Sequence, residues 1–480
     1  MLNVLKRLRL LVSSNKAKIL DEENQISPSA VDARYINAFY DAILSRDAVN
    51  VRHLLDYGIV DVNCDNGSGR TGLQFAAASG KTDIVEILLE KGANVNAEPA
   101  RRDGRTALQA ASEGGHLELV NRLLENGANV NAEPAVWDGR TALQAASEGG
   151  HLELVNRLLE NGANVNAEPA VWDGRTALQA ASEGGHLELV NRLLEKGANV
   201  NAEPAESDGR TALQAASEGG HLELVNRLLE KGANVNAEPA RSDGRTALQA
   251  ASEGGHLELV NRLWEKGANV NAEPAESDGR TALQAASEGG HLELVNRLLE
   301  KGANVNAEPT WGNGRTALQA ASEGGHLEIV NRLLENGANV NAEPTWRNGR
   351  TALQAASEGG HLELVNRLLE NGANVNAEPA EFHGRTALQA ASEGGHLELV
   401  NRLLEKGANV NAEPARGDGR TALQAASEGG HLELVNRLLE KGANVNAEPA
   451  EFLGRTALQA ASKGGHLEIV ERLCTAGATT

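Results

Sequence analysis

Eleven histidines recur every 35 residues, from His116 to His466, and histidine is a frequent metal ligand. Copies in neighbouring repeats would stand about 10 Å apart, the distance between packed helices, whereas zinc binds its ligands at about 2 Å. Two neighbouring histidines therefore cannot share one ion. The sequence predicts no metal site, and we expect these histidines to hold the start of a helix.

Two shorter motifs also match patterns that carry chemistry. Residues 67–72 spell the GxGxxG pattern of dinucleotide sites, but the expected strand before it and the longer helix after it are missing. Arg416-Gly417-Asp418 matches an adhesion tripeptide, but it is one of eleven variable triplets. A nucleophile, a base and an orienting residue do not occur together outside the repeated scaffold. We therefore expect no enzymatic activity and no cofactor.

The elements that carry these residues are copies of one 35-residue repeat. Repeats begin at Thr71 and at every thirty-fifth residue through Thr456, and residues 37–70 are a divergent first copy. The chain is therefore expected to hold thirteen repeats. Short repeated helices cannot stand alone, but each copy can bury its apolar face against its neighbours.

The repeat 106–140 serves as the specimen. Thr106 and Gln109 have the spacing of a capping box, which starts a first short helix, and Gly114-Gly115 ends it. A second helix is expected from about His116 to Asn126. Its main apolar stripe is predicted at Leu117, Val120 and Leu124, widened by Leu119 and Leu123.

After the second helix the chain runs through a loop, residues 132–140 in the specimen, which we call the finger. Glu133-Pro134 excludes a helix there, and Asp138-Gly139 predicts a tight hairpin turn. His383 and Leu453 replace the Asp or Asn of that turn in two copies, so those two fingers are expected to be the least regular.

Residues 106–132, TALQAASEGGHLELVNRLLENGANVNA, resemble the ankyrin repeat. Ala107 stands where that family usually has proline, Gln109 where it usually has histidine, and the finger is two residues longer than usual. The resemblance implies an all-α solenoid of about thirteen stacked helix pairs with hairpin-like fingers. It also implies binding of protein partners rather than catalysis. The near-identical repeats are similar to arrays of fungal ankyrin proteins, including those attached to immune-type receptors.

Variation between the regular repeats is concentrated in the triplet at each finger tip. The first two positions of each triplet are the candidate partner-binding residues, because the third mostly makes the turn. The candidates are Arg101, Arg102, Val136, Trp137, Val171, Trp172, Glu206, Ser207, Arg241, Ser242, Glu276, Ser277, Trp311, Trp346, Arg347, Glu381, Phe382, Arg416, Glu451 and Phe452.

The placement of aromatic residues supports this interpretation. Only 2% of the chain is aromatic, yet four of its five tryptophans lie in the triplets, and tryptophan and arginine dominate binding hot spots. Neutral drift in a tolerant loop is the alternative, but drift would also have altered Glu133 and Pro134, which stay constant in the regular repeats. The fifth tryptophan, Trp264, replaces a leucine expected to be buried, and we expect its ring to tilt outward.

Charged residues are repeated as well. The Glu113 position forms an acidic row and the Arg105 position a basic row, and we expect the two rows to neutralise each other. The net charge of −21 argues against nucleic-acid binding. Cys64 and Cys474 suggest free thiols in a reducing compartment, so an intracellular, cytoplasmic rather than nuclear location is expected. We expect a monomer without a membrane span.

The N-terminal residues 1–20 carry five basic residues and no acid, with leucines at helical spacing. They could target the protein, touch a membrane surface, or cover the exposed edge of the first repeat. Gln25 to Asp32 is predicted as a linker. Two domains are predicted: the basic amphipathic segment with its linker, residues 1–36, and the repeat array, residues 37–480. The array consists of the divergent repeat, residues 37–70, the regular repeats, residues 71–455, and the capping repeat, residues 456–480.

The sequence predicts a non-enzymatic scaffold that binds a protein partner through finger tips and the concave groove of the solenoid. The alternative is the sensor portion of a fungal defence or self/non-self recognition system. A module joined to an enzyme elsewhere and a designed consensus binder are further alternatives. The divergent first repeat argues against the designed binder.

Overall fold

The structure is a computed structural model that describes residues 28–99, 104–135, 139–170, 174–205, 209–240, 244–276, 279–310, 314–344, 349–380, 384–415, 419–450 and 454–479. The basic segment predicted at residues 1–20 lies outside these ranges. Within them the chain forms twenty-six helices, α2 to α27, as thirteen successive pairs, which confirms the predicted all-α array. The chain divides into two compact units, Met1–Ala205 and Glu206–Thr480.

The first compact unit contains five helix pairs. They are α2 (Pro28–Leu44), α3 (Ala48–Asp56), α4 (Gly72–Ala78), α5 (Thr82–Glu90), α6 (Ala107–Glu113), α7 (Leu117–Glu125), α8 (Ala142–Glu148), α9 (Leu152–Glu160), α10 (Ala177–Glu183) and α11 (Leu187–Glu195).

The second compact unit contains eight helix pairs. They are α12 (Ala212–Glu218), α13 (Leu222–Glu230), α14 (Ala247–Glu253), α15 (Leu257–Glu265), α16 (Ala282–Glu288), α17 (Leu292–Glu300), α18 (Ala317–Glu323), α19 (Leu327–Glu335), α20 (Ala352–Glu358), α21 (Leu362–Glu370), α22 (Ala387–Glu393), α23 (Leu397–Glu405), α24 (Ala422–Glu428), α25 (Leu432–Glu440), α26 (Ala457–Gly464) and α27 (Leu467–Thr475).

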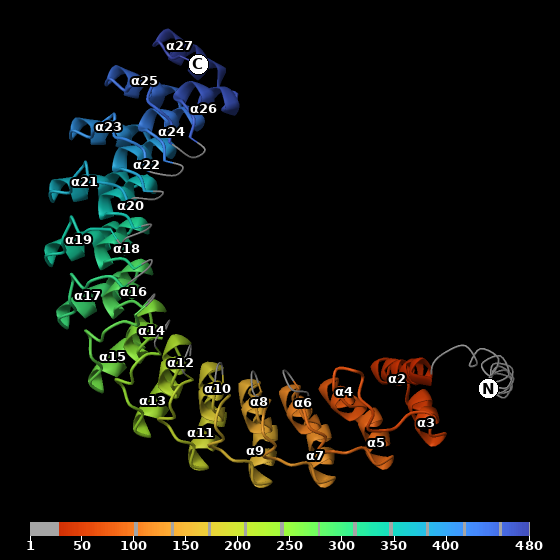
Figure 1. Cartoon of the computed structure of the whole chain (residues 1–480). Coiled ribbons are helices and arrows are strands. Elements are labelled where there is room, and N and C mark those ends of the chain that lie inside the picture. The colour runs from red at the N-terminus through yellow and green to blue at the C-terminus, as the bar shows by residue number, and fades with distance from the viewer. Residues whose placement is uncertain are drawn as a thin grey trace. The chain divides into compact units, whose positions relative to one another are not determined.

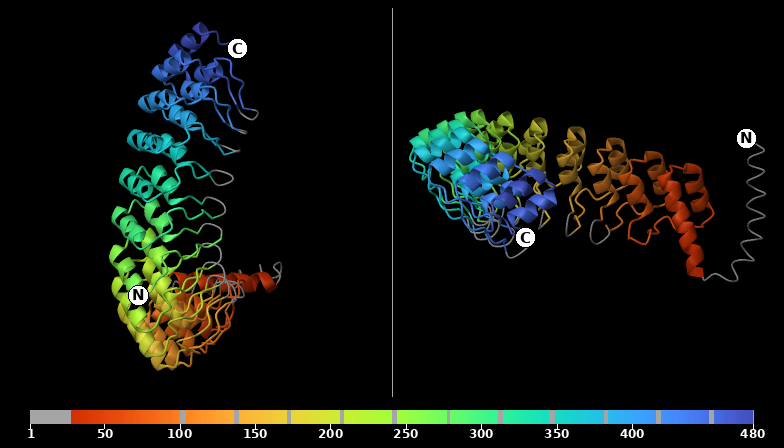
Figure 2. Two further views of the ribbon diagram at one scale, coloured as in Figure 1. Left: turned by 90° about the vertical axis from the view of Figure 1, so that its left-hand side faces the viewer. Right: turned by 90° about the horizontal axis from the view of Figure 1, so that it is seen from above.

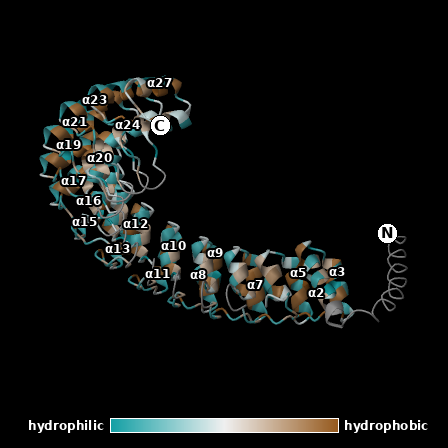
Figure 3. Ribbon diagram, turned by 45° about the horizontal axis from the view of Figure 1, so that its top comes forward, coloured by the Kyte–Doolittle hydropathy of each residue, from teal (hydrophilic) through white to brown (hydrophobic). Residues whose placement is uncertain are grey.

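Within each compact unit the helices stand in two rows (Figure 1). The even-numbered helices, here called the inner helices, pack on one another, and the odd-numbered outer helices form a second row behind them. The finger arms extend from one side of the helices in the second compact unit (Figure 2). Hydrophobic residues are seen on the helices of both units (Figure 3).

The regular inner helices start at the predicted capping box. In α6 the Thr106 side chain accepts a hydrogen bond from the Gln109 N–H, and the Gln109 side chain accepts one from the Thr106 N–H, so two orphan amides are satisfied. Leu108, Ala110 and Ala111 are buried. The small alanines let consecutive inner helices approach closely, which explains why a core with so few aromatic residues can be filled.

The outer helices bury a different stripe from the predicted one. In α7 the buried residues are Leu119, Val120 and Leu123, whereas Leu117 is 37% exposed and Leu124 is half-buried. The predicted stripe was centred on Leu117, Val120 and Leu124. It is therefore rotated about the helix axis relative to the buried stripe. Helical periodicity defines an apolar stripe, but four leucines on a short helix leave its centre undetermined.

The histidines do not hold the start of the outer helix as predicted. His116 occupies the N-cap position of α7 but makes no side-chain capping bond. A Cβ at Gly80, in the preceding repeat, or at Gly114 would come within 2.5 Å of its ring. His291 shows the same arrangement, and its Nε2 donates to the Glu253 carbonyl of the preceding repeat at 3.1 Å. The histidine thus joins two repeats.

The first helix begins inside the predicted linker Gln25–Asp32. α2 starts at Pro28, because proline has no N–H to lose in the first turn and its fixed φ suits a helix. Farther along α2, Phe39 and Tyr40 are buried, and the Tyr40 ring lies edge-on to Phe75. Phe39 and Tyr40 stand where a regular repeat has its leucine and its buried glutamine, and Phe75 stands where it has an alanine.

Trp264 does not tilt outward. Its side chain is half-buried and its Nε1–H has no hydrogen-bond acceptor among the described residues. The ammonium of Lys301, from the following repeat, lies 6.0 Å from the ring centroid. The ring occupies a Leu124-type position that is half-buried in the regular repeats, so there is partial room for it beside the next outer helix.

Candidate partner-binding surface

A buried glutamine connects each regular inner helix to the finger that follows. Gln249 is 2% exposed, and its Nε2 donates to the carbonyls of Ala272 and Glu273 at 3.1 and 3.3 Å. Its Oε1 accepts from the Thr246 N–H at 2.8 Å. One side chain therefore starts a helix and fixes the base of the next finger.

Asparagines link the same edge from repeat to repeat. The Asn131 Nδ2 donates to the Gly162 carbonyl at 2.9 Å, and its Oδ1 accepts from the Asn164 N–H at 2.7 Å. Asn236 makes the corresponding bonds to Gly267 and Asn269 in the second compact unit. Because each asparagine satisfies one donor and one acceptor of the next repeat, the finger bases are fixed to one another.

The two arms of a finger meet just below the triplet. The Gly139 N–H donates to the Ala135 carbonyl at 3.1 Å, and the same bond joins Gly174 to Ala170. A Cβ at Gly139 would come within 2.2 Å of the Ala135 nitrogen, so only glycine allows this approach. We call this contact the pinch. It closes a loop that contains the triplet alone.

The pinch gives the finger glycine a role that the sequence did not reveal. The Asp-Gly pair predicted a hairpin turn, but the third triplet residue lies outside the described residues. A Cβ at Gly384 or Gly454 would come within 2.3 or 2.4 Å of the backbone four residues earlier, much as at Gly139 and Gly174. The predicted irregularity of the finger tips that carry His383 and Leu453 lies outside the described residues and stays a prediction.

Of the twenty predicted partner-binding residues, Glu276 is the one that the structure describes. Its side chain is exposed and lies beyond Ala275, where the arm of the finger ends. The other predicted residues lie outside the described ranges, and they remain predictions. In the fingers whose flanking residues are described, such as Ala135 and Gly139, the triplet follows the point where two constant arms come together.

The acidic and basic rows pair as predicted. The Arg105 Nε lies 2.6 Å from the Glu113 Oε2, and the same pair recurs in the other regular repeats. In the second compact unit the arginines also reach the glutamate of the preceding inner helix, as Arg280 before α16 does to Glu253 of α14 at 3.9 Å. Each exposed pair contributes only about 0–1 kcal/mol. The inner-helix face therefore carries largely compensated charge.

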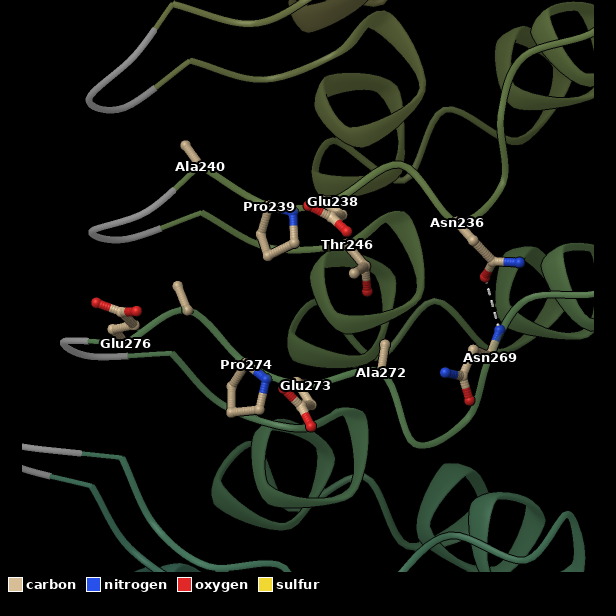
Figure 4. A pocket seen from close by; sticks show the side chains of 11 residues that line it. Asn236, Glu238, Pro239, Ala240, Thr246, Asn269, Ala272, Glu273, Pro274 and Glu276 are labelled. Atoms are coloured by element: carbon tan, nitrogen blue, oxygen red, sulfur yellow. Dashed lines mark hydrogen bonds between the residues drawn. The ribbon is translucent and has the colours of Figure 1, made fainter.

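A cavity of about 470 Å³ lies between two successive fingers of the second compact unit (Figure 4). Glu238 and Pro239 line it from one finger, and Glu273, Pro274 and Glu276 line it from the next. Its volume is in the range of small-ligand sites. The same residue types occur in neighbouring fingers, so the sequence repeats the lining along the array.

The described residues lack two other kinds of site. They contain no group of three or more His, Cys, Asp and Glu side chains that could hold a metal ion. No helix among them is long and apolar enough to span a membrane. Cys64 and Cys474 are both unpaired thiols.

The fold and the repeated finger surface define a repeat protein of the ankyrin class. The family model described as "Ankyrin repeats (3 copies)" matches eleven overlapping segments that together span residues 8–480. The chain therefore belongs to the ankyrin-repeat family, as the resemblance implied. Ankyrin repeats generally mediate protein–protein interaction and are typically non-enzymatic modules.

Two individual proteins are similar to this chain. A stretch of 56 residues is 45% identical to the E3 ubiquitin-protein ligase Ufd4 of Drosophila melanogaster, covering 12% of this chain and 2% of that protein. The human ASB11 ankyrin repeat domain is 30% identical and has a TM-score of 0.40, covering 49% of this chain and 100% of that one. This chain thus spans a small fraction of the length of the Drosophila ligase.

Proposed function

We propose that this protein is a non-enzymatic scaffold that captures a protein partner through its finger tips, with the inner-helix face beside them contributing to the contact. The observation that carries the proposal is the pinch. It joins the two residues that flank the triplet, at Gly139, Gly174 and Gly244, in a constant hydrogen-bonded base, which supports a triplet whose residues can change without altering that base. The placement of four of five tryptophans in those triplets supports it.

The test is affinity capture followed by mass spectrometry with two variants of the full chain. Replacing Trp137, Trp172, Trp311 and Trp346 with alanine is expected to abolish partner capture while leaving helical content and thermal unfolding unchanged. Trp264→Leu, which alters a tryptophan outside the fingers, is the matched control and should retain capture. Unchanged capture by the four-tryptophan variant would contradict the proposal.

A second candidate is the sensor portion of a fungal defence or self/non-self recognition system. The concentration of variation in the triplets favours it, since near-identical repeats can exchange unequally and reassort the triplets. Sequencing the gene in many individuals tests this candidate: the triplets should differ between individuals while the helices do not. Invariant triplets would argue against it.

We also propose that the protein is a cytoplasmic monomer. The negative net charge and the unpaired cysteines support this proposal. Imaging of a fluorescent fusion and light scattering of the purified chain test the two parts separately. A nuclear signal would contradict the first part, and a dimer mass would contradict the second.

A further inference from the structure

Two groups of exposed glutamates lie near the finger side of the repeats and differ in their partners. Glutamates of the inner helices pair with arginine, as Glu253 does with Arg245 and Arg280. A second group, which we call the finger glutamates, is exposed and has no cationic partner among the described residues. In the second compact unit the finger glutamates are Glu238, Glu273, Glu308, Glu343, Glu378, Glu413 and Glu448.

The finger glutamates stand beside a cavity rather than on an open face. Glu238 and Glu273 line the 470 Å³ space between their fingers together with Pro239 and Pro274 (Figure 4). The prolines offer an apolar wall on which the methylene stem of an arginine or lysine can pack while its charged head reaches a carboxylate. The cavity thus fits a long basic side chain.

A buried hydroxyl lines the same cavity. Thr246 is 5% exposed, and its oxygen accepts the Gln249 N–H of the capping box. No hydrogen bond among the described residues uses its hydroxyl proton, so this proton can be donated into the cavity. Figure 4 shows this hydroxyl directed toward the next finger. A carbonyl oxygen placed in the cavity would satisfy it.

The spacing of the repeats selects the shape of the ligand. Packed helices, and therefore successive finger bases, lie about 8–10 Å apart. A polyproline II helix rises about 3.1 Å per residue with three residues per turn, so it advances about 9.3 Å every third residue. It also leaves its backbone carbonyls without internal partners. Each turn of such a peptide presents a basic side chain and an unpaired carbonyl. Each repeat provides one finger glutamate and one threonine hydroxyl to bind them.

We propose that the finger bases of residues 206–480 bind an extended peptide that carries a basic side chain at every third position. The proposal rests on the proposed scaffold function and names the chemistry of its partner. Each finger glutamate pairs with one basic side chain, and the threonine hydroxyl at the start of the neighbouring inner helix donates to a peptide carbonyl. The constant finger base is thus specific for the three-residue spacing of the basic side chains. The triplets contact the parts of the partner that lie beyond this peptide.

Fluorescence anisotropy with the full chain tests the periodicity directly. The probes are two labelled peptides of equal composition, one with six Arg-Pro-Pro triplets and one with six arginines followed by twelve prolines. We expect the periodic peptide to bind at least about tenfold more tightly, since several exposed ion pairs form at once. Equal affinity for the two peptides would overturn the proposal and indicate charge attraction alone.

A matched pair of variants tests the residues. Replacing Glu238, Glu273, Glu308 and Glu343 with glutamine should weaken binding of the periodic peptide about tenfold. The control removes the same charge from exposed, unpaired glutamates of the outer helices, Glu223, Glu258, Glu293 and Glu328. The control should change affinity by less than about twofold. Equal losses in the two variants would contradict the assigned site.

The four-tryptophan variant separates this proposal from the scaffold function. It should keep its preference for the periodic peptide even though it loses partner capture. Loss of that preference in the tryptophan variant would place recognition in the triplets and overturn the role of the finger base. Retained capture by that variant would contradict the finger-tip proposal and leave the finger-base proposal standing.

Discussion

The divergent first repeat and the regular repeats make the same connections with different side chains. In the first repeat the Tyr40 hydroxyl bonds to the carbonyls of Cys64 and Arg70 at 3.0 and 2.6 Å, where a regular repeat uses the amide of its buried glutamine. Lys81 donates to the carbonyls of Ile43 and Leu44 at the end of α2, where a regular repeat uses histidine.

One pair of positions shows how closely these replacements are coupled. In the regular repeats the histidine ring lies over a glycine of the preceding repeat, as His116 does over Gly80. In the first repeat that position is Arg46, whose φ of 59° is left-handed, and the partner is the slender Lys81 instead of a ring. The fold therefore requires donors at these positions but does not require the regular residues. The near-identity of the regular repeats exceeds what folding demands.

The largest effect on stability is expected from replacing the buried glutamine of a regular repeat. Gln249→Ala removes three hydrogen bonds at once and should cost about 2–4 kcal/mol, measured by native-state hydrogen exchange of α14 and the following finger. Gln459→Ala is the matched control in the last repeat, where the exposed side chain accepts one hydrogen bond, from the Thr456 N–H, and makes no other among the described residues. Similar losses in the two variants would contradict the role of the finger-base bonds.

The Arg46–Lys81 coupling predicts a rescue. Lys81→His should crowd the new ring against the Arg46 side chain and cost about 1–3 kcal/mol of stability in the first repeat. Adding Arg46→Gly should recover most of that loss, because glycine accepts the left-handed φ without strain. Hydrogen exchange in α2 and α3 measures both. A double variant no more stable than Lys81→His would show that the two positions are independent.

The Tyr40 contact predicts a dependence on alkaline pH. Burial first, and then Cys64 and Asp65, raises the pKa of the Tyr40 phenol above its ordinary value, and burial with Asp61 and Asp65 raises the pKa of the Cys64 thiol from 9.0 to about 11. A raised pKa means that folding favours the neutral form. The Cys64 contribution to stability is therefore complete below about pH 9 and is lost between pH 9 and about pH 11.

Tyr40→Phe should cost about 1–2 kcal/mol at neutral pH, because the hydroxyl proton shared between the Cys64 and Arg70 carbonyls is lost while the ring is kept. It should also flatten the alkaline loss of stability above pH 10, since the titrating phenol is gone. Urea unfolding from pH 7 to pH 11, followed by hydrogen exchange in α2, measures both effects. An unchanged alkaline slope in the variant would show that Tyr40 titrates independently of folding.

The smallest effect concerns an irregularity inside a regular repeat. Trp264→Leu restores the usual residue and removes a buried indole N–H that has no acceptor within the described part of the chain. We expect a gain of about 1 kcal/mol, smaller than the penalty of a fully buried orphan because the ring is half-buried. Thermal unfolding measures it. A loss of stability would mean that the contact with Lys301 outweighs the missing bond.

The sequence predicted the elements of this fold well because they are repeated and locally encoded. The capping boxes, the helix pairs and the Arg105–Glu113 pairing follow from spacing along the chain. The face of the outer helix was misjudged, because its burial depends on the neighbouring repeat. The bridging role of His116 was missed for the same reason: its partners lie more than 30 residues away.

At the candidate surface, the sequence showed that the triplets vary. It did not show which contacts fix the finger base. The asparagine links and the carbonyl bonds of Gln249 join repeats that only the packed structure brings together. The Asn-x-Asn spacing was a visible signal that could have been followed. The pinch could not have been inferred, because Asp-Gly has a sufficient local explanation in the hairpin turn.

The pinch also makes each finger a natural insertion site. Because Gly139 and Ala135 already hold the two ends of the loop together, a longer segment placed between them needs little additional ordering at its ends, and loop-closure entropy grows slowly with length. The same bond joins Gly174 to Ala170 and Gly244 to Ala240, so at least three such sites occur along one chain. Peptide epitopes of different lengths could be displayed there side by side, in a chosen order, on a framework that stays the same.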